Sequence, residues 1–189
     1  MVEKGSKTEH NLMASFAGES QARNRYTFYA KKALKEGYEQ ISALFLETAD
    51  HEKEHAKRFF RLLSGDPVEI TATYPSFIGD TAANLKAAAA GENEEHTMIY
   101  PAAAEIAEQE GYPEVAKQWL DIAKVEAEHE KRYLKLLENV EKGLVFKREA
   151  KVFWKCRKCG RVVESTRAPV RCPCCDHSQS YFELFVEAY

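Results

Sequence analysis

Two copies of one short motif, a glutamate followed three residues later by a histidine, are the residues of this chain best suited to metal chemistry. They are Glu52-x-x-His55 and Glu126-x-x-His129. On a helix this spacing places both side chains on one face, one turn apart. Carboxylate oxygen combined with imidazole nitrogen favours iron or manganese over zinc. Either motif alone is common on solvated helix faces, so its meaning depends on the elements that position it.

Those elements are long helices. Apolar residues at helical spacing predict four of them, roughly over residues 7–36, 38–64, 81–110 and 112–141. Gly37 and Gly111 separate the members of each pair, as glycines after helix ends do. Residues 64–80 contain two prolines and no helical period, and they are long enough for a crossover connection. Short, long and short connections in that order are typical of ferritin-like bundles.

The two halves of this helical region repeat. The recurring pairs are Glu19 with Glu92, Tyr26 with Tyr100, Glu52 with Glu126, and His55 with His129. The first pair is 73 residues apart and the others are 74 apart, so one residue has been inserted between Glu92 and Tyr100. An extra residue within a helix is commonly absorbed as a π-bulge, and such bulges favour functional sites. We therefore predict a π-bulge in this segment.

Every predicted helix directs at least one carboxylate to its apolar face. The inward acidic residues and histidines are Glu19, Glu52, His55, Glu92, Glu95, Glu126 and His129. Buried carboxylates are normally paired or bound to metal, and no inward lysine or arginine recurs in the repeat. The pattern predicts a two-metal carboxylate site. Tyr26 and Tyr100, two turns beyond Glu19 and Glu92, are expected either to pack in the core or to hydrogen-bond a metal-bound carboxylate.

A competing motif overlaps the first of these pairs. Residues 51–55 read His-Glu-Lys-Glu-His and match the zinc-protease helix. The repeat partner of His51 is Val125, and no further ligand is evident outside the bundle. We interpret His51 as incidental, and His10 and His96 as solvated surface residues.

All five cysteines follow residue 155. Four of them form two Cys-x-x-Cys pairs separated by 12 residues: Cys156, Cys159, Cys172 and Cys175. Two such pairs predict a tetrahedral sulfur site, and their spacing leaves iron and zinc open. Cys174 is expected to be a free thiol beside the site.

Length and charge favour two domains, which we place at residues 1–143 and 144–189. Residues 141–189 carry 10 Lys and Arg against 6 Asp and Glu, net +4, whereas residues 1–140 carry 17 against 24, net −7. A basic module beside an acidic one suggests docking. The scattered basic residues predict no nucleic-acid partner. No stretch approaches the ~20 apolar residues of a membrane span, and the polar first ten residues lack a signal-peptide core, so we expect a cytoplasmic protein.

Taken together, these motifs resemble the rubrerythrin family over essentially the whole chain. The resemblance rests on Ala17-Gly-Glu19-Ser20, Glu52-x-x-His55, Gly91-Glu92-x-x-Glu95, Glu126-x-x-His129, Cys156-x-x-Cys159-Gly160 and Cys172-Pro173-x-Cys175. It implies a mainly α fold, with a ferritin-like four-helix bundle followed by a small β-rich rubredoxin-like domain. It also implies two iron ions in the bundle and one iron ion, in place of zinc, at the four cysteines.

The resemblance further implies roles for individual residues. Glu95 and His55 would compete for one iron according to its oxidation state. The standing ligands would be Glu19, Glu52, Glu92, Glu126 and His129. We expect Glu95, His55, Tyr26 and Tyr100 to take part in catalysis.

The activity implied is the reduction of hydrogen peroxide to water, in defence against oxidative stress. Electrons would come from NAD(P)H through a reductase or rubredoxin. Because the two sites of one chain can lie far apart, we expect a homodimer, either head-to-tail or domain-swapped. The alternatives are an iron-oxidising or storage protein, which has no need of the cysteines, and a non-enzymatic module with zinc in both sites.

Overall fold

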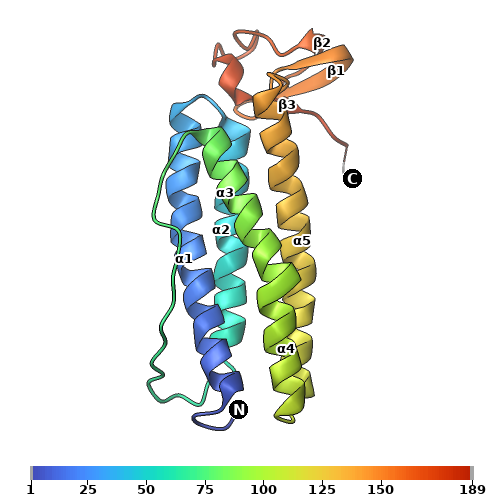
Figure 1. The fold of residues 1–189 in the computed structure, drawn as a ribbon. Helices are drawn as coiled ribbons and strands as arrows, with labels where there is room; N and C mark the ends of the chain where they lie inside the picture. Colours follow the sequence, from blue (N-terminus) through green and yellow to red (C-terminus); the bar gives the residue numbers. More distant parts are fainter. Residues whose placement is uncertain (1, 188–189) are drawn as a thin grey trace.

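The computed structural model describes residues 2–187, and most of them are helical (Figure 1). The elements are α1 Lys7–Lys35, α2 Glu39–Phe60, α3 Thr81–Glu94, a π-helical segment Glu95–Ile99, α4 Tyr100–Gln109, α5 Pro113–Glu141, β1 Lys147–Cys156, β2 Val162–Arg167, a 3₁₀ turn Gln179–Tyr181, and β3 Phe182–Leu184. Four long helical rods form the bundle, since α3, the π segment and α4 are continuous. The predicted ferritin-like bundle with a small β-rich domain is confirmed.

Local sequence explains where the helices begin and end. Ser6 caps α1 by accepting a hydrogen bond from the Glu9 N–H, and Glu9 Oε2 accepts one from the Gly5 N–H. Gly37 and Gly111, which follow α1 and α4, have φ values of +83° and +84°, a conformation that favours glycine. α2 ends at Phe60, earlier than expected, because its last turn tightens into i→i+3 hydrogen bonds.

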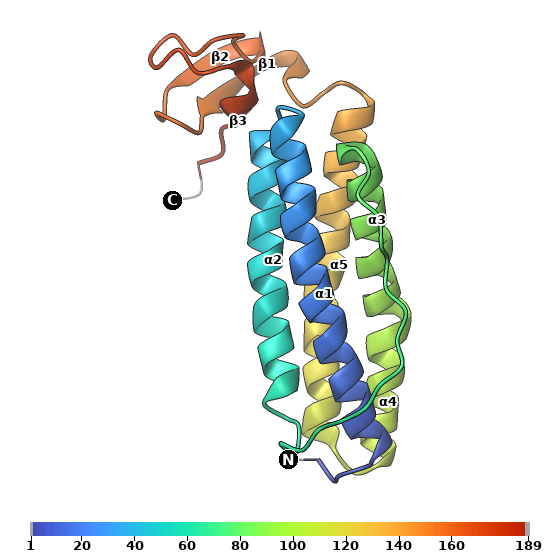
Figure 2. The same cartoon turned by 90° about the vertical axis from the view of Figure 1, so that its left-hand side faces the viewer.

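The connection between α2 and α3 runs the length of the bundle. Figure 1 shows it beside α1, and Figure 2 shows it crossing α1 and then running over α4 and α3 to the far end, where α3 begins. Asp80 caps α3 by accepting a hydrogen bond from the Ala83 N–H. Because the crossover returns to the opposite end of the bundle, the second helix pair runs in the reverse direction to the first, and the glutamates near the middle of the four rods meet at one level.

The predicted π-bulge is confirmed between α3 and α4, over Glu95–Ile99. It lies within the interval where the repeat offset changes from 73 to 74 residues. The extra residue is therefore absorbed inside the helix, and Tyr100 regains the buried position that Tyr26 has in the first half.

The core consists of two apolar clusters with a polar layer between them. One contains Leu12, Phe59, Tyr100, Trp119 and Ile122. The other contains Tyr26, Phe45, Leu85, Ala89 and Tyr133. Along each long rod a buried glutamate lies between members of the two clusters. The polar layer is thus clamped from both sides.

The C-terminal module is a three-stranded antiparallel sheet in the order β2-β1-β3. Trp154, Cys156, Ala168, Cys172 and Phe182 form its core. It sits at the end of the bundle where α5 finishes (Figure 1), and Phe146 stacks on Tyr38 with ring centroids 6.2 Å apart.

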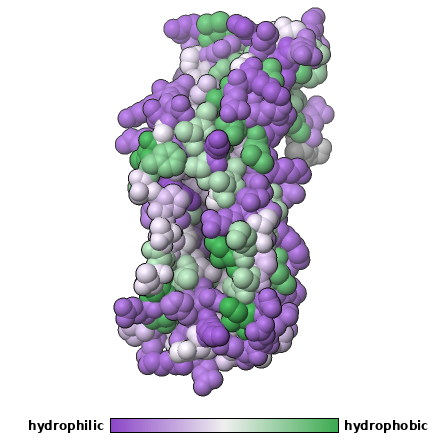
Figure 3. Space-filling model, in the orientation of Figure 1, coloured by the Kyte–Doolittle hydropathy of each residue, from purple (hydrophilic) through white to green (hydrophobic). Residues whose placement is uncertain are grey.

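The surface seen in Figure 3 is largely hydrophilic, with apolar residues dispersed over it. Among the described helices, none is both long and apolar enough to cross a membrane.

Candidate metal centres

Four glutamates, one from each long helical rod, meet in the polar layer. Each of these residues is at most 1% exposed: Glu19, Glu52, Glu92 and Glu126. His129 is 3% exposed, and His55 is half-buried. The four helices converge because apolar residues above and below each glutamate pack into the two clusters. Sequence reasoning therefore located these six residues together.

The carboxylate and imidazole atoms form two overlapping groups, each with four potential ligand atoms within 4.8 Å of one another. One group is Glu19, Glu52, His55 and Glu126, and the other is Glu52, Glu92, Glu126 and His129. Glu52 and Glu126 belong to both. His55 Nδ1 lies 2.9 Å from Glu126 Oε1, and His129 Nδ1 lies 2.8 Å from Glu126 Oε2. One carboxylate therefore faces both metal positions with its two oxygens.

Several of these atoms lack a hydrogen-bond partner within the described residues. They are Glu19 Oε2, Glu52 Oε1, Glu92 Oε2, both Glu126 oxygens and His129 Nδ1. Buried polar atoms without partners are costly, and cations are the usual remedy for clustered carboxylates. The donor set, mostly carboxylate oxygen with one imidazole at each position, fits a pair of iron ions.

Glu95 stands apart from both groups. It is the first residue of the π segment, it is half-buried, and it lines a cavity of about 350 Å³. This structure therefore has His55, and not Glu95, among the clustered ligand atoms.

The two tyrosines hydrogen-bond the glutamates, which is one of the two roles expected for them from the sequence. Tyr26 O–H on α1 donates to Glu92 Oε1 at 2.6 Å, and Tyr100 O–H on α4 donates to Glu19 Oε1. The bonds cross between the halves of the repeat. Each leaves the second carboxylate oxygen free for a metal, and each tyrosine also packs in an apolar cluster.

Charge in the layer is balanced by the histidines when metal is absent. Burial lowers the pKa of His55, but the close approach of the Glu126 and Glu52 carboxylates, each 2.9 Å from His55 Nδ1, outweighs burial and raises that pKa to about 9. The same opposition at His129, with Glu126 as its strongest partner, raises its pKa to about 12. Burial and the Glu52 charge raise the pKa of Glu92 to about 8.

These pKa values predict proton release on metal binding. At pH 7 the metal-free layer holds protons on His55, His129 and Glu92, since each pKa lies above 7. Ligands must lose these protons, so ferrous affinity should fall as the pH falls from 9 to 6, on the order of tenfold per pH unit for each proton released. Anaerobic ferrous titration in weak buffer with a pH indicator measures the release. Binding without acidification would contradict the assignment of these residues as ligands.

Some nearby residues differ from their sequence interpretation. His96 is not freely solvated, because its Nε2 lies 2.7 Å from Glu130 Oε2 and its side chain is 20% exposed. His10 is exposed, as expected. His51, interpreted as incidental, places Nδ1 3.1 Å from His129 Nε2 and stacks on that ring. A ligand histidine commonly has such an outer partner.

Arg25 was not anticipated at all. It is 8% exposed on α1 and faces the same cavity as Glu95. Its repeat counterpart is Ile99, so Arg25 does not belong to a pair of cations that recurs in the two halves of the sequence. The residues on either side of Arg25 form an ordinary helix sequence with no motif, and only the packing of the structure shows that its side chain is buried.

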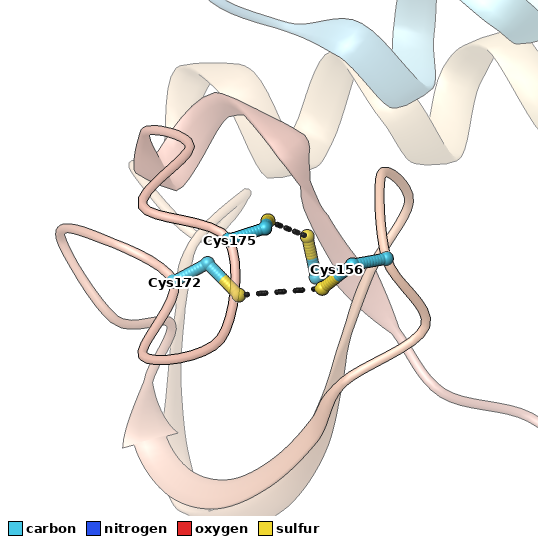
Figure 4. A group of neighbouring side chains, drawn as sticks. Cys156, Cys172 and Cys175 are labelled. Carbon is cyan, nitrogen blue, oxygen red and sulfur yellow. Dashed lines mark hydrogen bonds between the residues drawn. The ribbon is translucent and has the colours of Figure 1, made fainter.

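The four paired cysteines converge in the C-terminal module (Figure 4). Cys156 Sγ lies 3.8 Å from Cys175 Sγ, and Cys159 Sγ lies 3.6 Å from Cys172 Sγ. A tetrahedral metal with ~2.3 Å bonds to sulfur places its ligands about 3.8 Å apart. None of the cysteines is in a disulfide within the described residues. The geometry fits one metal ion held by four thiolates.

Cys174 is exposed and outside this group, as expected. It lies between Cys172 and Cys175 in the second Cys-x-x-Cys pair, where the Asp176 N–H donates a hydrogen bond to the Cys172 carbonyl.

Comparisons with known proteins agree with both sites. The family model described as rubrerythrin matches residues 10–153, and that of the rubrerythrin rubredoxin-like domain matches residues 154–183. The rubrerythrin of Porphyromonas gingivalis is 62% identical over 181 residues, covering 95% of this chain and 90% of that protein. A solved structure of nigerythrin in a mixed-valence state is 30% identical, with a TM-score of 0.65, covering 97% of this chain and 88% of that one.

The bacterioferritin BfrA of Mycobacterium tuberculosis matches with a TM-score of 0.66 at 19% identity, over 75% of this chain and 90% of that one. At that identity the likeness concerns the fold alone. The family models and the relatives together account for both modules and for the cofactors expected in them, two iron ions in the carboxylate–histidine site and one at the four cysteines. The chain therefore belongs to the rubrerythrin family.

Proposed function

We propose that this protein is a peroxidase that reduces hydrogen peroxide to water at the di-iron site, with electrons supplied through the four-cysteine iron. The observation that carries the proposal is the presence, in one chain, of a two-metal carboxylate site and a sulfur-ligated site suited to single-electron transfer. The overall reaction takes two electrons and two protons per peroxide and yields two water molecules. An iron-storage role, the alternative, makes no use of the cysteines.

The residues around the site have different proposed roles. Bound iron would supply the two electrons that break the O–O bond. Tyr26 and Tyr100 hold Glu92 and Glu19 through hydrogen bonds, which keeps one oxygen of each carboxylate directed at a metal position. The cavity beside Glu95 is large enough to admit peroxide and reaches Tyr100.

Glu95 is proposed to join the site when the metals are more highly charged. Its place at the start of the π segment, outside both ligand groups yet beside the cavity, supports a role that changes during the cycle. We predict that Glu95→Ala slows peroxide turnover by roughly 10–100-fold, the range seen when a metal's supporting partner is lost, while the helical content is unchanged.

Steady-state peroxide consumption and far-ultraviolet circular dichroism measure these two effects. Glu108→Ala, which replaces an exposed carboxylate on α4 that does not line the cavity, is the matched control. Unchanged kinetics in Glu95→Ala would contradict the proposed role.

Electron delivery is proposed to cross between subunits of a homodimer. The C-terminal module contacts the bundle near Tyr38, and Glu52 follows Tyr38 by 14 residues, about 21 Å of helix. Within one chain, this separation between the C-terminal module and the di-iron site is long for direct electron transfer. A head-to-tail or domain-swapped dimer would bring the basic C-terminal module of one subunit to the acidic bundle of the other. A reductase or rubredoxin would reduce the four-cysteine iron.

Co-expression of two inactive variants tests this arrangement. Glu126→Gln disables the bundle and Cys172→Ser disables the tail. If transfer is between subunits, mixed dimers should recover about a quarter of wild-type activity, because half of the dimers are mixed and each has one complete pair. No recovery in mixtures proven to contain mixed dimers would show that transfer is within one chain.

We also propose a reducing, cytoplasmic setting, which is supported by five cysteines that form no disulfide within residues 2–187.

A further inference from the structure

Arg25 is a buried cation whose charge is not accounted for. It lies on α1 and is 8% exposed, and its Nε and Nη1 are inaccessible to water and have no hydrogen-bond partner within residues 2–187. A guanidinium stays charged at any physiological pH, and leaving its donors unpaired in the interior is costly. Its one identified favourable contact is with the Tyr26 ring, whose centroid lies 5.5 Å from the guanidinium carbon.

Glu95 is the complementary group on the facing helix. Glu95 is half-buried, and its carboxylate belongs to neither ligand group. It lines the same cavity as Arg25, between α1 and the π segment, under Tyr74 and Pro75 of the crossover.

Gly91 brings the two groups close. A Cβ added at Gly91 would lie 3.6 Å from Arg25 Nη2, so the guanidinium rests against the α3 backbone at this point. Gly91 and Glu95 are four residues apart, and side chains at that spacing share a face of a helix. The Arg25 guanidinium therefore lies about one helical turn from Glu95.

We propose that the positive charge of Arg25 in the shared cavity stabilises the Glu95 carboxylate there whenever Glu95 is not a metal ligand, and that it thereby sets the balance between Glu95 and His55 at that metal position. The inference rests on the proposed function, in which Glu95 joins and leaves the site. Arg25 is a positioning residue: it stabilises the carboxylate away from the metals and touches neither metal group. Arginine suits this role because its delocalised charge is more weakly hydrated than the ammonium group of lysine.

A double-mutant cycle tests the coupling in the full-length, iron-loaded protein. The midpoint reduction potential of the di-iron pair is measured by anaerobic titration in wild type, Arg25→Met, Glu95→Gln and the double variant. Loss of Arg25 should drive Glu95 towards the ferric metal and lower the potential. In the Glu95→Gln background that effect should shrink, with a coupling on the order of tenfold in the oxidation equilibrium constant, as for residues coupled through a shared cavity.

Two further variants separate this role from a general loss of charge. Arg132→Met removes another partly buried cation, one that pairs with Glu47 and Thr48, and its effect should be the same with or without Glu95. Arg25→Lys keeps the charge on a more strongly hydrated ammonium group and should fall between wild type and Arg25→Met. If Arg25→Met loses iron, the cycle is run with Arg25→Lys, for which a smaller shift of the same sign is expected.

Equal shifts from the Arg25 substitution in both Glu95 backgrounds would overturn the proposal. The readout needs no peroxide. A protein that proved inactive towards peroxide would contradict the proposed function and still report whether Arg25 and Glu95 are coupled.

Discussion

Glu126→Gln will empty both iron positions of the bundle and reduce peroxide turnover on the order of 100-fold or more. Glu126, like Glu52, directs one oxygen to each metal position, and its oxygens lie 2.9 Å from His55 Nδ1 and 2.8 Å from His129 Nδ1. Loss of an outer partner of a metal ligand typically lowers affinity or activity 10–100-fold, and loss of a shared ligand should exceed that. Metal analysis should fall from about three iron ions per chain to about one, the remaining ion being at the cysteines.

Glu130→Gln is the matched control for this experiment. Glu130 lies on the same helix, one turn further, and its carboxylate pairs with His96 outside both ligand groups. This variant should keep all its iron. Retention of two bundle irons in Glu126→Gln would show that Glu126 is not shared between the metals.

Cys172→Ser will remove the colour of the sulfur-ligated iron and abolish turnover driven by a protein electron donor. Cys172 is buried, and its Sγ lies 3.6 Å from that of Cys159 in the four-sulfur group. The bundle is built from other elements, so chemically reduced di-iron should still react with peroxide once at the wild-type rate. Steady-state assays with a rubredoxin or reductase, and single-turnover assays after dithionite reduction, separate the two effects.

Cys174→Ser provides the comparison within the same knuckle. Cys174 is exposed and lies outside the sulfur group, so its replacement should change neither the colour nor the turnover. Undiminished donor-driven turnover in Cys172→Ser would mean that electrons reach the bundle without the cysteine site.

Much of the site was predictable because the repeat places its ligands in register. A glutamate–histidine pair on an apolar stripe has a position fixed by helical geometry, and a second copy 74 residues later fixes the partner helix. The change of offset to 73 at Glu92 sufficed to locate the π segment, because an insertion within a continuous helix has few other outcomes.

What the sequence could not provide are contacts that depend on how helices rotate against one another. Tyr26 pairs with Glu92 and Tyr100 with Glu19, across the repeat. The contact of His51 with His129 and the burial of Arg25 have no counterpart in the other half, where Val125 and Ile99 stand. Periodicity identifies a face of a helix, but it does not identify the rotamer or the neighbour of a side chain that breaks the repeat.

The most direct test of peroxide reduction is a stopped-flow experiment on anaerobically reduced protein. Hydrogen peroxide is added to the fully reduced, three-iron form while the visible spectrum and peroxide concentration are followed. We predict rapid loss of one peroxide per di-iron site, followed by return of the red colour of the cysteine-bound iron as a further half-equivalent of peroxide is consumed, since the three ferrous ions supply three electrons. Reoxidation no faster than that of protein lacking Glu126, or zinc at the four cysteines, would contradict a peroxidase fed through the C-terminal module.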